Sequence, residues 1–214
     1  MKKVLCLCIA FLLCFMTVGY AAEEATSTDA AEETADDLFG RVEDENYVNE
    51  LIGFGFKLDG WHFCTDEEID ALNAISKTVL TEDFAKMMEQ VDNLYIMMAL
   101  ANDGTNINIS LRPLGDYAVL YKAMGMESIA KSSVDSTVSM LKMAGYQDVS
   151  VEYIKTPVED QEYDGLQAKF NLQNQSLCSR IIMLICDKYL VTITMTGRDE
   201  NKVGESFQKL YHLK

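Results

Sequence analysis

Apolar and polar residues alternate along several short stretches of this chain. The clearest case is the stretch 106–111, where Ile107, Ile109 and Leu111 alternate with polar neighbours. Similar alternation is found in the stretches 54–58, 149–153, 166–172 and 191–195. Because side chains on a strand point alternately to its two faces, each of these stretches predicts a strand with one apolar face.

Two stretches are apolar throughout, residues 94–100 and 181–186. A continuous apolar run of this length predicts a central strand that is covered on both faces. The Asp103-Gly104 pair after the first run is a hairpin signal. Strands joined by such tight turns predict a mainly antiparallel sheet.

Helices are predicted where a capping residue precedes an amphipathic stretch. Thr65 and Thr81 each precede one, and Asp199 precedes the last one. The final helix is expected to bury Val203, Phe207, Leu210 and Tyr211. A longer helical stretch over residues 116–144 is interrupted near Gly125 and ends before Gly145, where a left-handed C-cap is expected.

The predicted order is therefore β, α, α, β, β, α, β, β, β, β, α. This order indicates the α+β class, with a mainly antiparallel sheet and helices on both faces in an α/β/α sandwich. No repeat and no Pro/Gly-rich linker divides residues 46–214, so we expect them to form a single domain.

The N-terminus has the features of an export signal over residues 1–21. Two lysines precede an apolar run over residues 4–18, and small residues precede a cleavage site after Ala21 or, alternatively, after Ala22. The run of about 15 apolar residues is shorter than the roughly 20 needed for a membrane-spanning helix. Cys6, Cys8 and Cys14 each follow a leucine rather than a small residue, which argues against a lipid anchor. We therefore expect no stable membrane span after cleavage.

Residues 22–45 form a short acidic segment, which we interpret as a disordered spacer. They contain ten acidic residues and one basic residue, Arg41, in a chain with a formal net charge of −16. Such a composition buries too little apolar area to offset the entropy lost on ordering. The acidic balance makes nucleic acid a poor partner.

Three cysteines remain after cleavage: Cys64, Cys178 and Cys186. Cys178 and Cys186 fall on one predicted strand, about 26 Å apart at the usual strand rise, so they cannot pair with each other. Cys64 can form a disulfide with either of them, or all three can be free thiols that pack as small apolar residues.

The motifs of common enzyme and metal sites are absent from the sequence. His62 and Cys64 are two residues apart and supply two metal ligands or a Cys-His pair at most, with no second pair following. There is no phosphate-binding glycine loop and no Gly-x-Ser-x-Gly elbow. The alternative interpretation of His62 is a structural corner next to Trp61.

An adaptable binding patch is predicted around Gly125. Met124 and Met126 flank this glycine, and Tyr117 and Tyr121 lie one helical turn apart just before it. The alternative is that this turn simply packs against the sheet. Methionines in the predicted strands are interpreted as core residues.

Several of these features together resemble the PsbP-like fold. Tyr47 precedes a strand that ends in Gly60-Trp61, an acidic helix start follows at Thr65, and the chain closes with Tyr189-Leu-Val-Thr-Ile-Thr-Met-Thr-Gly and a helix. Asp59 stands where the family usually has a proline before Gly-Trp. The resemblance covers roughly residues 46–213. It implies an α/β/α sandwich that binds protein partners rather than catalysing a reaction. Separately from the resemblance, we expect no cofactor.

We therefore expect an exported, non-enzymatic binding module, secreted or held in a bacterial cell envelope, whose partner is another protein or a peptide outside the cytoplasm. The binding candidates are Trp61, His62, Tyr117, Tyr121, Met124 and Met126. The alternative is a small-molecule-binding or hydrolytic domain with a pocket between sheet and helices.

Overall fold

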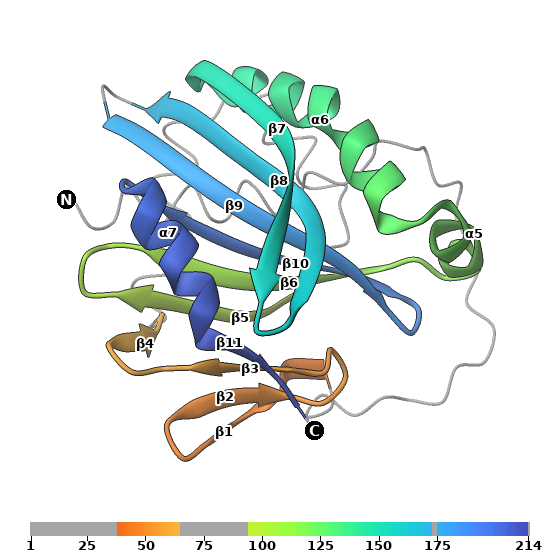
Figure 1. Cartoon of the computed structure of the whole chain (residues 1–214), viewed down its shortest axis with the longest axis vertical. Coiled ribbons are helices and arrows are strands. Elements are labelled where there is room, and N and C mark those ends of the chain that lie inside the picture. Colours follow the sequence, from red (N-terminus) through yellow and green to blue (C-terminus); the bar gives the residue numbers. More distant parts are fainter. Residues whose placement is uncertain (1–37, 65–93, 173–174, 214) are drawn as a thin grey trace.

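The computed structural model describes residues 38–64, 94–172 and 175–213 (Figure 1). The expected signal peptide, most of the expected spacer and the helices expected after Thr65 and Thr81 lie outside the described residues.

Seven antiparallel strands form a large sheet in the order β4-β5-β6-β10-β9-β8-β7. Their bounds are β4 Trp61–Phe63, β5 Leu94–Ala101, β6 Asn106–Pro113, β7 Gln147–Val158, β8 Gln161–Leu172, β9 Gln175–Cys186 and β10 Tyr189–Gly197. The two continuous apolar runs fall in β5 and β9, and the four long strands β7 to β10 follow one another along the chain as a meander. The prediction that these stretches form strands is confirmed, but β5 is not a central strand, because it lies beside the short edge strand β4.

The helices are α5 Tyr117–Met124, α6 Met126–Met143, α7 Glu200–Ser206 and the 3-10 turn η1 Phe207–Lys209. Gly125, at φ 78°, separates α5 from α6, and Gly145 follows α6 at φ 95°, as predicted. The Asp199 side chain caps α7 by accepting hydrogen bonds from the backbone N–H groups of Asn201 (3.0 Å) and Lys202 (3.4 Å).

A second, smaller sheet was not predicted as such, although the strand expected over residues 54–58 is confirmed as one of its members. It has the order β1-β2-β3-β11, with bounds β1 Arg41–Glu43, β2 Asn46–Asn49, β3 Phe54–Lys57 and β11 Leu210–His212. Strand β1 lies inside the range expected for the disordered spacer, so the ordered chain begins before Asn46. The β1–β2 turn closes because Asp44 and Glu45 both adopt positive φ, at 47° and 61°, which is the geometry of a tight hairpin.

The prediction that the final helix continues to Tyr211 is wrong. The helical segment ends with η1, and Leu210–His212 pairs with β3 instead. Tyr211 is opposite Gly55 in this pairing, and a side-chain carbon at Gly55 would overlap the Tyr211 ring. The absence of a side chain at Gly55 therefore makes room for the added strand.

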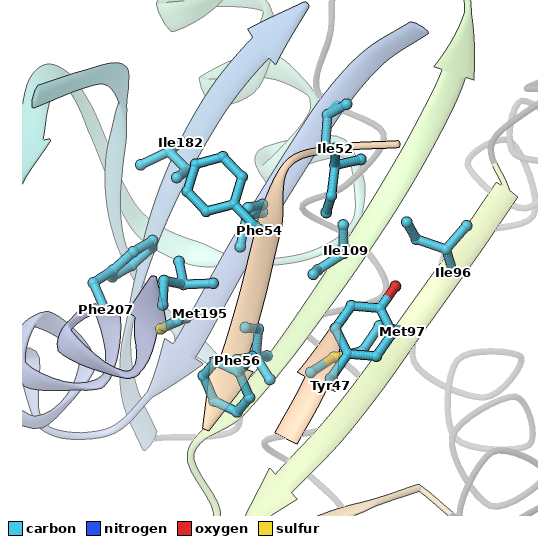
Figure 2. Close-up of a cluster of buried hydrophobic side chains, with 14 of the residues drawn as sticks. Tyr47, Ile52, Phe54, Phe56, Ile96, Met97, Ile109, Ile182, Met195 and Phe207 are labelled. Atoms are coloured by element: carbon cyan, nitrogen blue, oxygen red, sulfur yellow. The ribbon is translucent and has the colours of Figure 1, made fainter. Parts of the chain in front are cut away.

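Two apolar cores cover opposite faces of the large sheet. In the first core, Ala130 and Leu141 of α6 pack with residues of β8, β9 and β10. In the second core, Phe54 and Phe56 of the small sheet and Phe207 pack against β5, β6, β9 and β10 (Figure 2). The described part of the chain is thus an α+β structure with mainly antiparallel sheets, as predicted.

No helix among the described residues is long and apolar enough to span a membrane. Cys64, Cys178 and Cys186 all carry free thiols, which decides between the two alternatives left open by the sequence. Burial raises the pKa of both Cys178 and Cys186 to about 11, so these two thiols stay protonated near neutral pH.

Candidate functional site

Trp61 and His62 lie on opposite sides of β4. Trp61 packs edge-on against Phe56, with ring centroids 5.1 Å apart, and belongs to the second core. His62 is exposed, whereas Cys64 follows the end of β4 and is half-buried, so the expectation that their side chains share one side of a strand stays a prediction. In the described part of the chain, no group of three or more His, Cys, Asp or Glu side chains is placed to hold a metal ion.

The predicted patch around Gly125 divides into outward and inward residues. Tyr117 and Met124 are exposed, whereas Tyr121 and Met126 pack against the first core. The Tyr121 hydroxyl accepts a hydrogen bond from Arg112 Nη2 at 3.2 Å. Sequence reasoning missed Val119 and Leu120, which are also exposed. We call Tyr117, Val119, Leu120 and Met124 the α5 patch.

A second apolar site lies between residues of the two sheets, and we call it the hairpin groove. It has a volume of about 470 Å³ and is lined from one side by residues 39–42 and Tyr47 of the first hairpin, and from the other by Phe63, Cys64 and residues 95–98. Tyr47, Ile96 and Met97 of this lining belong to the cluster in Figure 2. None of the predicted binding residues lines this groove.

Three large apolar side chains around the groove remain exposed to solvent. Phe39 is 44% exposed, Val42 is 55% exposed and Phe63 is 37% exposed. The Phe63 ring meets the edge of the Tyr47 ring, with centroids 6.3 Å apart, so the two walls are in contact at one point. Exposed apolar residues gathered in this way are typical of binding surfaces.

Buried hydrogen bonds hold the hairpin wall in place. The fully buried Asn49 donates from Nδ2 to the Leu38 carbonyl (2.9 Å) and to the Tyr47 hydroxyl (3.0 Å). Its Oδ1 accepts from the Ile52 N–H at 3.2 Å. The Tyr47 hydroxyl in turn donates to the Phe39 carbonyl at 3.0 Å, and burial raises the pKa of Tyr47 to about 12. The wall is therefore preformed rather than assembled by a ligand.

The backbone before β1 also approaches β2 closely. Gly40 has φ 68°, and a side-chain carbon there would lie 2.5 Å from the Val48 carbonyl oxygen. Only glycine fits both requirements. Phe39 and Val42, which lie on either side of Gly40 in the sequence, both line the groove.

The hairpin that forms this wall is acidic. It contains one basic residue, Arg41, and four acidic residues, which are Glu43, Asp44, Glu45 and Glu50. Arg41 is held by Glu43 at 2.6 Å and by Glu50 at 2.8 Å, so its charge is matched within the hairpin. The hairpin therefore carries an excess of negative charge, and the one charged residue among those that line the groove is Arg41.

A carboxylate, an imidazole and a phenol are joined by hydrogen bonds elsewhere in the fold. His212 Nδ1 lies 2.7 Å from Glu159 Oε2, and His212 Nε2 lies 2.7 Å from the Tyr163 hydroxyl. The order of these groups is that of a catalytic relay. Burial, with nearby negative groups, raises the pKa of Tyr163, so the phenol is not an activated nucleophile.

This cluster instead ties β11 to the tip of the β7–β8 hairpin. The Glu159 carboxylate also accepts the backbone N–H of His212 at 3.0 Å, and the Phe54 ring lies 5.1 Å from the imidazole ring. The sequence did not indicate this contact because 53 positions separate Glu159 from His212 and no short motif links them.

We compared the chain with known proteins. No protein-family model matches it, and no curated protein sequence matches it.

Proposed function

We propose that this protein is an exported, non-enzymatic binding module whose hairpin groove receives an apolar segment of a protein or peptide partner outside the cytoplasm. The observation that supports this most directly is the convergence of exposed Phe39, Val42 and Phe63 on one preformed apolar groove. Export to the envelope or medium is supported by the signal pattern of residues 1–21.

The charge around the groove narrows the chemistry of the partner. The excess negative charge of the hairpin favours a segment whose apolar residues are flanked by lysine or arginine, because opposite charges speed the encounter and exclude acidic competitors. The net charge of the whole chain, −16, also favours a positively charged partner segment. We therefore expect binding to weaken as the salt concentration rises.

The proposal includes a PsbP-like sandwich with helices on both faces of the sheet. It is supported by the position of α6 in the first core and of α7, through Val203, in the second core on the opposite face. The small sheet shares the second face with α7. A binding role fits this arrangement, although a fold by itself does not specify a function.

A peptide selection tests the proposal. The purified chain is immobilised and a display library of random twelve-residue peptides is passed over it. We expect an enriched consensus with an apolar centre and basic flanks. The double variant Val42→Ser, Phe63→Ser removes two exposed apolar contacts and should lose this consensus.

The matched control is Leu120→Ser in the α5 patch, which also removes one exposed apolar side chain. This variant should select the same consensus as the unchanged protein. If no consensus is enriched, or if only Leu120→Ser loses it, the groove is not the binding site. Urea unfolding of each variant checks that the fold is kept.

A small apolar molecule is the second candidate, favoured by the groove volume of about 470 Å³, which is within the range of ligand pockets. A thermal-shift screen separates the two candidates. A true ligand at a hundred times its Kd stabilises the fold by about 2.7 kcal/mol. The hydrolytic form of this candidate requires His62, which is not among the groove-lining residues.

A further inference from the structure

The cluster of Glu159, His212 and Tyr163 has a property that the proposed binding function does not use. When the His212 imidazole is neutral, its Nδ1–H donates to Glu159 Oε2 at 2.7 Å, so Nε2 carries a lone pair. The Tyr163 hydroxyl lies 2.7 Å from this Nε2 and can donate to it. Gln161 Oε1 lies 3.0 Å from the same hydroxyl, but an amide oxygen is a far weaker base. The imidazole is therefore placed to accept the phenol proton of Tyr163.

Two other tyrosines of the fold show the contrast. The Tyr153 hydroxyl donates to Asp164 Oδ1 at 2.6 Å, and a carboxylate is ordinarily a much weaker base than an imidazole. The Tyr121 hydroxyl accepts a hydrogen bond from Arg112 Nη2 at 3.2 Å, so its neighbour is a donor rather than a base. Among these three tyrosines, Tyr163 has the strongest proton acceptor beside its hydroxyl.

A proton acceptor at this position favours loss of an electron from the phenol. One-electron oxidation makes a phenol hydroxyl strongly acidic, so the electron leaves most readily where a nearby base takes up the proton in the same step. Burial, with nearby negative groups, raises the pKa of Tyr163, so the hydroxyl keeps its proton near neutral pH until the electron leaves. Once the proton is on Nε2, the Glu159 carboxylate stabilises the imidazolium. A small oxidant can reach the cluster, because the side chain of His212 is 22% exposed and that of Glu159 is 47% exposed.

We propose that Tyr163 is a site of oxidative modification, at which a small one-electron oxidant such as nitrogen dioxide removes an electron while His212 takes up the proton. This inference goes beyond the proposed function, because neither residue lines the hairpin groove.

The reaction has two steps. One nitrogen dioxide molecule takes an electron from the Tyr163 phenol and becomes nitrite, and the hydroxyl proton moves to His212 Nε2, which later returns it to water. A second nitrogen dioxide molecule forms a C–N bond to the ring carbon beside the one that carries the oxygen, and the hydrogen of that carbon moves to the oxygen. Two nitrogen dioxide molecules and one tyrosine thus give one nitrotyrosine, one nitrite ion and one proton.

The test exposes the purified protein to nitrogen dioxide, generated by irradiation of a buffered nitrite solution, and measures the nitration of each tyrosine by peptide mass spectrometry. The comparison residue is Tyr117, which is 53% exposed, whereas Tyr163 is half-buried. We expect Tyr163 to be nitrated at least about threefold faster than Tyr117, since a positioned proton acceptor speeds such a transfer by roughly a hundredfold or more and lower exposure offsets only part of this gain. An equal or higher rate at Tyr117 would overturn the proposal, because exposure alone would then decide the site.

Two variants test the role of the proton acceptor. His212→Gln keeps a polar side chain but removes the base, and it should slow the nitration of Tyr163 at least about tenfold and leave that of Tyr117 unchanged. Glu159→Gln keeps the imidazole but removes the carboxylate that stabilises the imidazolium, and it should slow the nitration of Tyr163 by a smaller factor. The matched control is Asp164→Asn, which removes the acceptor of another tyrosine and should leave the rate at Tyr163 unchanged.

Urea unfolding checks that each variant keeps the fold. An unchanged rate at Tyr163 in folded His212→Gln protein would overturn the proposal, even if Tyr163 is the fastest site in the unchanged protein. If His212→Gln does not fold, the rate at Tyr163 in Glu159→Gln decides in the same way. The measured product is a modified tyrosine rather than a bound peptide, so the outcome is independent of the hairpin groove.

Discussion

Glu159 shows how one side chain can join distant parts of this chain. It occupies the left-handed region, with φ 53°, at the tip of the β7–β8 hairpin. That conformation is costly for a residue with a side chain. Here the carboxylate accepts both the backbone N–H and the imidazole of His212, and these bonds hold it in place.

These hydrogen bonds lower the pKa of Glu159 below its ordinary value. A lowered pKa means that the carboxylate stabilises the fold above the ordinary glutamate pKa of about 4.3 and that this stabilisation is lost as the pH falls through the folded-state pKa. We therefore predict that Glu159→Gln lowers the urea midpoint at pH 7, and that the difference from the unchanged protein shrinks toward zero below about pH 4.

The matched control for this prediction is Glu205→Gln, which neutralises an exposed carboxylate on α7. Its urea midpoint should differ little from that of the unchanged protein over the same pH range. A Glu159→Gln difference that stays constant, or that grows in acid, would show that the bonds to His212 do not stabilise the fold.

In helix α5, the apolar sequence pattern does not indicate which side chains are buried. It is strongly apolar, yet Ala118 is its one buried residue. The 3.6-residue period correctly predicted a helix that breaks at Gly125, but it cannot say which apolar side chains find a partner surface. Tyr121 turns inward because Arg112 of β6 donates to its hydroxyl.

The two sides of α5 should respond very differently to a charge. We predict that Ala118→Asp lowers the free energy of unfolding by about 2 kcal/mol or more, because it buries a carboxylate in the first core. Leu120→Asp should change it by less than about 0.5 kcal/mol, because that side chain is 53% exposed. Urea unfolding of both variants measures the two changes in the free energy of unfolding. Similar losses for the two would mean that the α5 patch is covered by another surface.

At the scale of the whole molecule, the charge is unevenly distributed along the chain. The negative charge is concentrated near the N-terminus, with ten acidic residues in residues 22–45. Part of that range, residues 41–45, forms β1 and its turn. The groove-lining residues 39–42 thus come from a range whose composition alone indicated a spacer.

We predict that the chain loses its signal when it is produced in a host that secretes it. The intact mass of the secreted protein should correspond to a start at Ala22 or, for the alternative cleavage site, at Glu23. The same measurement without reductant should show no disulfide, in accordance with the free thiols of Cys64, Cys178 and Cys186. A secreted chain that keeps residues 1–21 would contradict the export signal.

Much of the fold could be predicted from the sequence because the relevant signals are local. The stretches 94–100, 106–111 and 181–186, the break at Gly125 and the Asp199 cap each depend on neighbours a few residues away. The small sheet could not be predicted. Strand β11 follows an amphipathic pattern that also suits a helix, and it forms because β3, about 150 residues earlier, offers a free edge over Gly55.

The candidate site depended still more on tertiary structure. The hairpin groove joins residues 39–47, 63–64 and 95–98, and no residue pattern marks these three segments as one surface. The sequence by itself determined the class of the fold, its long strands and helices, and the expected export. Which apolar side chains stay exposed was decided only by packing, because burial depends on partners brought together from distant parts of the chain.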